Sequence, residues 1–434
     1  MKTVTVIGAG LAGSEAAWQL AKRGIKVKLY EMRPKKMTPA HHTGLFAELV
    51  CSNSLRSNLL ENAAGLLKEE MRRLDSLIIK CADNNTVPAG SALAVDREGF
   101  ARQVTRMIEE NHNIEVIRQE LIEFPAGPAI IATGPLTSDE LTKALANALD
   151  CEYLYFYDAV SPIVTADSLD MDLIFRASRY GKAGDHYLNC PFTREEYEEF
   201  WSELVEAKVY PLKRFEDLKV FEGCMPVEVM AKRGKDTLLY GPLRPVGLTD
   251  PRTGHTPYAV VQLRQDNAQG TLYNLVGFQT NLRWSEQNRV FRMIPGLKNA
   301  EFVRYGVMHR NTYINSPRLL LNTLQLKTDP GIMFAGQITG VEGYIESTAS
   351  GLVAGIGMAK MMEGKPLPAL PRETAMGSLI RYITSASDEG FQPMNANFGL
   401  LPPLEERVKD KKRRNRMLAE RSLECLDRIV RDLD

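Results

Sequence analysis

The chain has 434 residues, of which 44% are hydrophobic and 25% charged, a balance typical of a soluble globular protein rather than a disordered or membrane one. Lysine plus arginine equals aspartate plus glutamate at 54 each, so any surface for nucleic acid must be a local basic patch. No apolar run approaches the roughly 20 residues of a membrane span, and the first predicted strand leaves no room for a signal peptide. We therefore expect a cytoplasmic protein of two or three domains with no membrane partner.

The first 33 residues follow a strand, turn, helix, strand pattern. A β-branched run at residues 4–7 precedes Gly8, Gly10 and Gly13, which have G-x-G-x-x-G spacing. Such glycines allow a tight turn, close approach of a pyrophosphate, and close packing of the helix on the strand. Glu31 ends the second strand about 20 residues later, where a carboxylate accepts hydrogen bonds from ribose hydroxyls. The stretch predicts a dinucleotide site but does not distinguish FAD from NAD.

The chain then alternates irregular and periodic segments. Residues 34–58 lack periodicity, and so much polar, irregular chain beside a nucleotide fold indicates a functional loop. Thr133 and Gly134 end a buried run at what would be the carboxyl edge of the sheet. In this part, helices are predicted at residues 59–80 and 98–111, and short buried strands at residues 114–117 and 129–132.

From about residue 151 to about 328 the pattern changes to alternating aromatic and β-branched runs. One helix, at residues 194–207, interrupts them. Asn267 and Gly270 form a turn between the last two runs. Together these features predict a mostly antiparallel insertion with its own small core. Its strands are predicted at residues 153–157, 237–240, 258–263 and 272–280.

From Gly331 the sequence again has the pattern of the first domain: a buried strand, a glycine-rich turn and a helix of small residues over 344–362. The first domain is therefore predicted to be closed by chain that returns after the insertion. The helix N-terminus near Gly343 would offer backbone N–H groups to a ligand. The expected domains are a nucleotide-binding part, an insertion, and a returning part with C-terminal helices, at residues 1–150, 151–328 and 329–434.

The tail has a helical period over residues 404–434, and a basic run at 409–416 precedes its apolar positions. Such a run is usually a solvated helix face. Together with Lys35 and Lys36 it would instead contribute to a surface that contacts phosphates.

Two of the six cysteines lie in settings that suit thiol chemistry. Cys51 is followed by polar and cationic residues, including Arg56, which would lower the pKa of a partly exposed thiol. Cys224 lies in FEGCMPVE, where a turn would present its side chain. For both, the ordinary role of a small buried hydrophobe stays open. The cysteines have no paired spacing, which is typical of free thiols in a reduced compartment. Four are expected to be structural: Cys81, Cys151, Cys190 and Cys425.

Three histidines are further candidates for site residues. His41 and His42 are adjacent, which does not suit two ligands of one metal, and no partner follows at zinc spacing, so we expect no metal. His309 is either a hydrogen-bonded structural histidine or, with its polar neighbours, a substrate contact. The chain has no G-x-x-x-x-G-K-S/T, H-E-x-x-H or G-x-S-x-G motif, which argues against the common ATPase, zincin and α/β-hydrolase classes.

Long motifs occur along essentially the whole chain, several of them outside the nucleotide domain. They are GAGLAGSEAAWQLAKRG, LYEMRP, AELVCSNSLRSN, LAVDR, IIATGPLTS, FEGCMPVEVMAKRG, YAVVQLRQDN, RYGVMHRNTYINSP, FAGQITGVEGYIESTASGLVAG and FQPMNANFGLL. In sequence and order they closely resemble the bacterial family of folate- and FAD-dependent tRNA (uracil-54-C5)-methyltransferases.

The resemblance implies an α/β fold in which a Rossmann-like FAD-binding domain of the glutathione-reductase type is interrupted by a mixed, largely antiparallel insertion domain. NADH or NADPH would reduce the FAD, 5,10-methylenetetrahydrofolate would supply the one-carbon unit, and uracil in the tRNA T loop would accept it. The implied FAD-binding residues are Gly8, Ala9, Gly10, Leu11, Ala12, Gly13, Glu31, Arg33, Thr133, Gly134, Gly336, Gln337, Gly343, Ser347 and Gly351.

Cys51 and Cys224 match the two catalytic cysteines of that family. Because C5 of uracil is a poor nucleophile until something adds at C6, a thiolate that attacks C6 generates the reactive enolate, a role we assign to Cys224. Cys51 would be the second thiol, protecting or activating the one-carbon carrier or assisting proton removal from C5; the reverse assignment stays open. The base must leave its stack to react, so a basic rim should hold phosphates around the cleft.

Two alternatives remain. A flavin-dependent oxidoreductase acting on a small molecule would use the insertion as a substrate cap, and fold-level analogy alone does not exclude it. Another tRNA-uridine-modifying flavoprotein is the nearest competitor within the same class. The sequence does not predict the oligomeric state.

Overall fold

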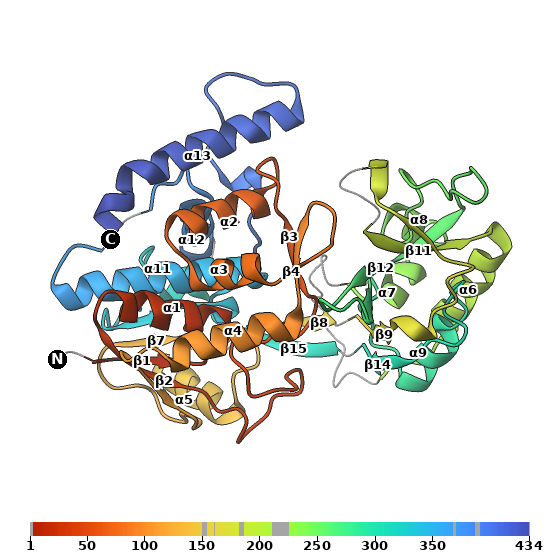
Figure 1. Cartoon of the computed structure of the whole chain (residues 1–434). Coiled ribbons are helices and arrows are strands. Elements are labelled where there is room, and N and C mark those ends of the chain that lie inside the picture. Colours follow the sequence, from red (N-terminus) through yellow and green to blue (C-terminus); the bar gives the residue numbers. More distant parts are fainter. Residues whose placement is uncertain are drawn as a thin grey trace.

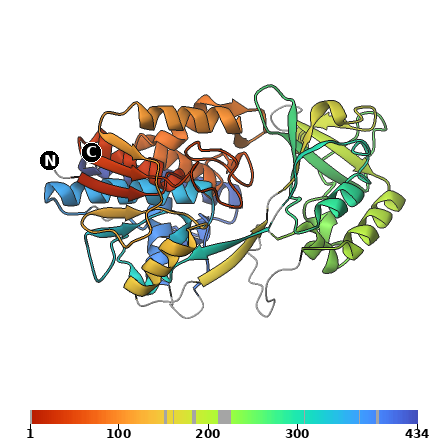
Figure 2. The ribbon, with the colours of Figure 1, turned by 90° about the horizontal axis from the view of Figure 1, so that it is seen from below.

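The computed structural model describes residues 3–149, 154–159, 161–181, 186–210, 225–306, 308–367, 370–386 and 391–433. They form two lobes side by side, one built on a parallel sheet and the other on an antiparallel sheet (Figure 1). Strands β8 (Leu154–Ala159) and β15 (Met308–Tyr313) pair antiparallel and run between the lobes (Figures 1 and 2). The chain therefore crosses from one lobe to the other on a paired ribbon.

The first lobe centres on a five-stranded sheet in which all neighbouring strands are parallel. Side chains such as Val4 and Val6 are fully buried, as expected in a parallel sheet covered on both faces. Because β16 pairs with β7, the prediction that returning chain closes the first domain is confirmed. The strand order is β16 (Ile332–Phe334), β7 (Ala129–Ile131), β1 (Thr3–Ile7), β2 (Lys26–Tyr30) and β6 (Ile114–Ile117).

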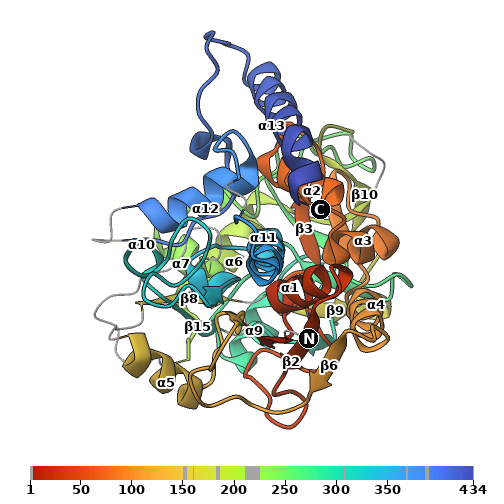
Figure 3. The same ribbon diagram turned by 90° about the vertical axis from the view of Figure 1, so that its left-hand side faces the viewer.

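Helices α1 (Leu11–Lys22) and α11 (Tyr344–Glu363) lie side by side against this sheet (Figures 1 and 3). Their backbones approach closely at Gly351, where an added Cβ would lie 2.2 Å from the carbonyl oxygen of Ala12. Only glycine fits such an approach. Since α1 follows β1 and α11 follows β16, both helix N-termini lie at the carboxyl edge of the sheet.

The remaining elements of this lobe surround the core. Buried Glu70 on α2 accepts hydrogen bonds from the backbone N–H groups of Ala375 (2.6 Å) and Met376 (2.9 Å) at the start of α12, and one from Ser422 on α13. The helices are α2 (Ala63–Arg73), α3 (Leu77–Asn84), α4 (Arg97–Glu109), α5 (Asp139–Leu149), α10 (Ser316–Leu319), α12 (Ala375–Ser385) and α13 (Lys411–Leu433). A small antiparallel sheet has the order β3 (Ser54–Ser57), β5 (Ala92–Val95) and β4 (Thr86–Val87).

The second lobe is a six-stranded sheet in which all paired neighbours are antiparallel, which confirms the predicted type of insertion. The strand order is β10 (Phe175–Ala177), β11 (Tyr187–Phe192), β12 (Ala259–Gln265), β13 (Leu272–Leu275), β9 (Ile163–Thr165) and β14 (Phe302–Arg304). Val261 and Leu263 of β12 belong to the lobe's main core, whereas Val260 belongs to a second cluster with Phe175. This alternation is the two-residue period of a strand buried on both faces. The helices here are α6 (Arg194–Glu206), α7 (Val227–Lys232), α8 (Thr237–Tyr240) and α9 (Trp284–Phe291).

The two lobes have separate cores. Buried members of the main core of the second lobe run from Val164 to Ala300 along the chain. Tyr313, the last residue of β15, and Ile314 and Leu320, which follow it, pack in the core of the first lobe instead. In the described residues, the chain therefore passes from one core to the other at β8 and again at β15.

Three sequence-based predictions differ from the structure. Residues 237–240 are a helical turn rather than a strand: Leu238 is buried while Tyr240 is 85% exposed, and Gly241 ends the turn. The described part of the second lobe has four α-helices, α6 to α9, where one was predicted, because short helices such as α9 bury only a few apolar residues and carry little periodic signal. The strand predicted over 272–280 ends at Leu275, since Gly277 adopts φ +78°.

The helical period over residues 59–80 also spans a break. Its apolar residues are buried as one face, yet the chain forms α2 and α3 with a turn between them. Asp75 adopts φ +54° in that turn, and Ser76 caps α3 by accepting a hydrogen bond from the Ile79 N–H at 3.3 Å. The hydrophobic period of the sequence therefore predicted one helix where the chain forms two.

Candidate active site

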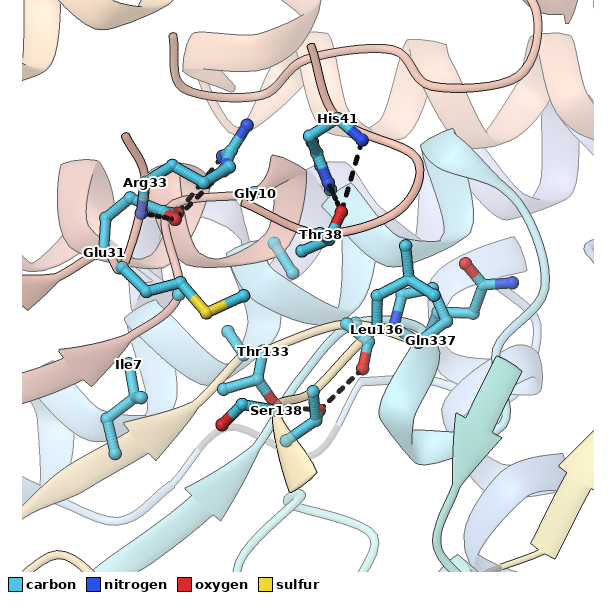
Figure 4. A pocket seen from close by; sticks show the side chains of 18 of the residues that line it. Ile7, Gly10, Glu31, Arg33, Thr38, His41, Thr133, Leu136, Ser138 and Gln337 are labelled. Carbon is cyan, nitrogen blue, oxygen red and sulfur yellow. Dashed lines mark hydrogen bonds and ion pairs between the residues drawn. The ribbon is translucent and has the colours of Figure 1, made fainter. Parts of the chain in front are cut away.

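A cavity opens at the carboxyl ends of β1, β2 and β7 (Figure 4). Open α/β sheets bind ligands at this edge, where strand ends and helix N-termini meet. The walls come from the β1–α1 turn, the loop after β2, residues 119–121, the β7–α5 connection, and the chain that leads into α11. The cavity thus combines both parts of the predicted nucleotide domain.

The structure gathers most of the predicted FAD-binding residues around this cavity. Ala9, Gly13, Gly343 and Gly351 do not line it: Ala9 donates its N–H to Glu31 Oε2 at 3.0 Å, and Gly351 packs α11 on α1. The predicted residues that line the cavity are Gly8, Gly10, Leu11, Ala12, Glu31, Arg33, Thr133, Gly134, Gly336, Gln337 and Ser347.

The β1–α1 turn is shaped by its glycines. Gly8 has φ +95°, and an added Cβ at Gly13 would lie only 1.8 Å from the carbonyl oxygen of Gly8. An added Cβ at Gly10 would meet no atom within 4 Å. Because Gly10 lines the cavity and no side chain caps α1, the first-turn N–H groups face open space. This end of α1 suits a phosphate anion.

Glu31 and Arg33 form a buried pair on the cavity wall (Figure 4). Arg33 donates to Glu31 through its backbone N–H at 2.9 Å and through Nε at 3.0 Å. Burial opposes charge on Glu31, but the hydrogen bonds from Arg33 and its positive charge lower the pKa of the carboxyl below its ordinary value. Glu31 therefore presents an ionised acceptor to the cavity.

His41 also lines the cavity, although the sequence raised it only as a metal ligand. Its Nδ1 lies 2.6 Å from Thr38 Oγ1 (Figure 4). Burial, together with the charge of Arg33, lowers the pKa of His41 to about 4, so the ring is neutral near pH 7. Among the described residues, no group of three or more His, Cys, Asp and Glu side chains is arranged to hold a metal ion.

The start of α11 forms the opposite wall. Tyr344 and Ser347 line the cavity on the first turn, and Gly343 precedes them without a side-chain cap. Gln337 lies on the approach to this turn and donates to Glu342 Oε2 at 2.7 Å. A second helix N-terminus with uncapped N–H groups thus borders the same cavity.

Tyr344 links this wall to the Cys51 loop. The backbone N–H groups of Cys51 and Ser52 donate to the Tyr344 hydroxyl oxygen at 2.6 and 3.2 Å. Cys51 itself is half-buried. One side chain therefore borders the cavity and holds the backbone of the candidate thiol.

Three guanidinium groups surround the Cys51 loop, and each interacts electrostatically with Cys51. Arg97, at the start of α4, donates to the Leu49 carbonyl, and Arg304, at the end of β14, donates to the Val50 carbonyl. Arg264 of β12 donates to Ser52 Oγ at 2.5 Å. Nearby positive charge favours a thiolate over a thiol. Two of the three cations come from the second lobe, so the site is completed only where the lobes meet.

The other cysteines have different surroundings. Cys224 and Cys151 lie outside the described residues. Cys81 and Cys190 are buried, and burial raises the pKa of both thiols, that of Cys81 to about 12. Cys425 is half-buried on α13. Cys81 and Cys190 thus have the inert settings of structural cysteines.

Two further candidates are placed only in part. His309 lies in β15, opposite Asp158 of β8, but its side chain is outside the described residues. The basic run starts α13, where Lys412 and Arg416 lie within 4.0 and 3.5 Å of Glu61. Lys36 instead pairs with acidic residues near β6 and α5.

Comparison with known proteins covers the whole chain. The family model described as GIDA, glucose inhibited division protein A, matches residues 3–366. A Desulforamulus reducens protein named methylenetetrahydrofolate--tRNA-(uracil-5-)-methyltransferase TrmFO is 65% identical over 424 residues, 98% of this chain and 96% of that protein. The chain belongs to the TrmFO family.

Further TrmFO relatives agree in length and order. Proteins of the same name from Anoxybacillus flavithermus and Bacillus subtilis are 63% and 61% identical, cover 99% and 100% of this chain, and are covered over 100% and 99% of their own length. Two crystal structures of Aquifex aeolicus GidA, both 17% identical, align with TM-scores of 0.72 and 0.69, covering 99% and 98% of this chain and 73% and 76% of theirs. At that identity the likeness shows the fold alone, and it confirms the predicted Rossmann-like α/β domain with an insertion.

Sequence reasoning missed several polar residues of this TrmFO-family site. All but His41 lie within the quoted motifs, and His41 was considered only as a metal ligand; nothing in their spacing distinguished them from other surface or core residues. They are His41, Arg97, Arg264, Arg304 and Tyr344. In the described part of the chain no helix is long and apolar enough to span a membrane.

Proposed function

We propose that this protein methylates C5 of uracil-54 in the T loop of tRNA, with FAD as cofactor and 5,10-methylenetetrahydrofolate as the one-carbon donor. The observation that carries the proposal concerns Tyr344. This side chain lines the cavity at the sheet edge, and its hydroxyl accepts a hydrogen bond from the backbone of Cys51, whose thiol is half-buried. That arrangement suits a reaction in which a cofactor and a cysteine act on the same substrate atom. Family membership supports the folate donor and the tRNA substrate.

The residues of the cavity fit FAD. The open space at Gly10 and the uncapped N-terminus of α1 suit a pyrophosphate, and ionised Glu31 suits ribose hydroxyls. On the far wall, the N-terminus of α11 with Tyr344 and Ser347 suits the electron-rich edge of the ring system. When bound, FAD would supply the redox chemistry that converts a one-carbon unit to a methyl group. We propose NADH or NADPH as its reductant.

The two cysteines have separate proposed roles. Cys224 adds to C6 of uracil, so that C5 gains the nucleophilic character of an enolate, and leaves when the proton on C5 is removed. Cys51, held at its backbone by Tyr344 and surrounded by guanidinium groups, is the thiol on the cofactor side. It would assist proton removal from C5 or protect the one-carbon carrier.

The other finer assignments follow from this function. We propose a cytoplasmic enzyme, because its proposed substrate is tRNA. We propose domain limits close to the lobe crossings, with the insertion facing the RNA and a basic rim around the cleft that holds the phosphates beside the extruded base.

The test is to incubate the purified flavoprotein with unmodified tRNA transcript, methylenetetrahydrofolate and NADH or NADPH. We expect 5-methyluridine in the T loop, detected by nucleoside mass spectrometry. Absence of that nucleoside refutes the proposal, and steady NAD(P)H oxidation without any RNA modification would favour a small-molecule oxidoreductase instead. A Cys224→Ala protein that still traps 5-fluorouracil-containing tRNA covalently would transfer the nucleophile role to Cys51.

A further inference from the structure

Two aromatic and two cationic side chains lie on the surface of the second lobe where 207–210 meets 281–284. Trp284 is 52% exposed and Tyr210 is 41% exposed, which is unusual for side chains this large. Lys208 and Arg283 are exposed, and neither forms an ion pair with any residue that the structure describes. We refer to Lys208, Tyr210, Arg283 and Trp284 as the aromatic patch.

The backbone places these residues together. Val209 and Leu282 form an antiparallel bridge, the Arg283 N–H donates to the Lys208 carbonyl at 3.0 Å, and the Tyr210 N–H donates to the Asn281 carbonyl at 3.0 Å. In such a pairing, residues at positions 208, 210 and 283 point to one face. Lys208 and Arg283 therefore share a face with Tyr210, and Trp284 directly follows Arg283 at the start of α9.

Trp284 is held rigidly as the outer ring of a stack. Its ring lies 5.4 Å from that of Tyr305 at an interplanar angle of 18°, and Tyr305 lies 5.6 Å from Phe302 at 18°. Phe302 packs on the core of the second lobe. Three parallel rings thus extend from the core to a half-exposed indole.

Buried polar groups fix both sides of the stack. The Gln287 side chain donates to the carbonyls of Leu282 and Gly306, both at 2.8 Å, and accepts from the Gly306 N–H at 2.8 Å. Asn288 donates to the Tyr305 hydroxyl at 2.8 Å. The platform is therefore ordered before any ligand arrives, which lowers the entropy cost of binding.

The patch lies next to the candidate active site along the chain. Arg304 donates to the Val50 carbonyl beside Cys51. Along the chain it directly precedes Tyr305, the middle ring of the stack. Tyr210 is the last described residue before the segment that contains Cys224. Figure 1 shows α9, which begins with Trp284, on the side of the second lobe opposite α8 and beside β14.

We propose that Trp284 is a stacking platform for an unpaired base of the tRNA, and that Lys208 and Arg283 hold the phosphates that flank this base. Aromatic rings beside cations are the common means of binding single-stranded nucleic acid, because every base offers a π-face to stack on. A protein partner would bury such a patch against apolar side chains and would not require the two unpaired cations. The proposal rests on the proposed function, since it identifies where the same tRNA is held.

The first test uses the intrinsic fluorescence of the FAD-loaded protein. The chain has three tryptophans, so replacing the other two (Trp18→Phe, Trp201→Phe) leaves emission from Trp284 alone. We expect unmodified tRNA transcript to quench this emission with the same Kd that an independent binding assay reports. The matched control keeps only Trp201, whose indole donates to the Ala231 carbonyl at 3.0 Å, and its emission should not change.

The second test measures affinity. Trp284→Ala should raise the Kd for tRNA by about 5- to 150-fold, and Trp284→Phe by much less, because a ring remains for stacking. Tyr240→Ala removes an 85%-exposed aromatic from the other side of the lobe and should leave the Kd unchanged. Lys208→Gln and Arg283→Gln should each reduce the slope of log K against log salt by about 1.

The outcomes separate the two proposals. If tRNA binds and is methylated while Trp284 emission and the Kd of Trp284→Ala are unchanged, the platform is refuted and the patch becomes a candidate contact for a protein. A protein that neither binds nor methylates tRNA refutes the proposed function, and the platform with it.

Discussion

The cavity at the sheet edge and the junction around Cys51 are built in different ways. In the cavity, backbone conformation does most of the work: glycine turns and helix N-termini come from short, contiguous stretches of chain. At the junction, side chains from α4, β12, β14 and α11 converge on one loop. The contrast teaches that local chain geometry shapes the cavity, whereas contact between the two lobes sets the surroundings of the Cys51 thiol.

The largest expected effect comes from the turn at the cavity. Gly13→Ala places a Cβ 1.8 Å from the Gly8 carbonyl oxygen, so the turn must open. We expect the free energy of unfolding to fall by about 1–3 kcal/mol and the purified protein to lose its FAD. Thermal melting and flavin absorbance measure the two effects.

Gly10→Ala is the matched control for that substitution. Its Cβ meets no protein atom within 4 Å, so the apoprotein should melt as the wild type does. FAD affinity alone should fall, because the methyl group projects into the space left for a ligand. Equal destabilisation by both substitutions would contradict this account of the turn.

The next effect concerns His41. Because its folded pKa of about 4 lies below the ordinary value of 6.5, the unfolded state binds the extra proton first as pH falls. Stability should therefore decrease between about pH 6.5 and pH 4, by at most about 3 kcal/mol. Urea unfolding across this range, compared with His41→Gln, measures the contribution.

His112→Gln, at an exposed position, is the control for the pH series. It should leave the pH dependence intact. A His41→Gln protein whose stability falls as steeply as that of the wild type would show that another group is responsible.

A smaller effect is expected at the link between the two regions. Tyr344→Phe removes the oxygen that accepts from the Cys51 and Ser52 N–H groups but keeps the ring on the cavity wall. We expect kcat for tRNA methylation to fall about 10-fold, equivalent to about 1.4 kcal/mol, with FAD retained. Tyr382→Phe, which removes a hydroxyl elsewhere in the first lobe, should have no effect; loss of FAD in Tyr344→Phe would instead assign the hydroxyl to the cofactor site.

The smallest predicted change tests the electrostatics of the junction. Arg264→Gln removes one of the three cations near Cys51, so alkylation of this thiol by iodoacetamide should slow about 5-fold, as expected from about 1 kcal/mol of lost charge stabilisation. Peptide mass mapping follows Cys51 separately from the other cysteines. Arg264→Lys keeps the charge and should react faster than Arg264→Gln; equal rates would show that charge does not control this thiol.

Much of the fold followed from local patterns. The alternation of strands and helices, the returning β16–α11 unit and the antiparallel insertion all leave periodic signals in the chain. The short helices α7, α8 and α9 were missed, as was the break at Asp75, because a turn or two of helix buries too few side chains to impose a period.

By itself, the sequence determined the glycine turn between β1 and α1, because G-x-G-x-x-G fixes a backbone shape that depends on neighbours in the chain. The family motifs likewise singled out both cysteines. Only the tertiary structure decided that Arg97, Arg264 and Arg304 meet at Cys51, that Tyr344 joins this loop to the cavity, and that Trp284 stacks on Tyr305. These contacts join residues up to 293 positions apart, and no local periodicity encodes which distant side chains meet when two lobes pack together.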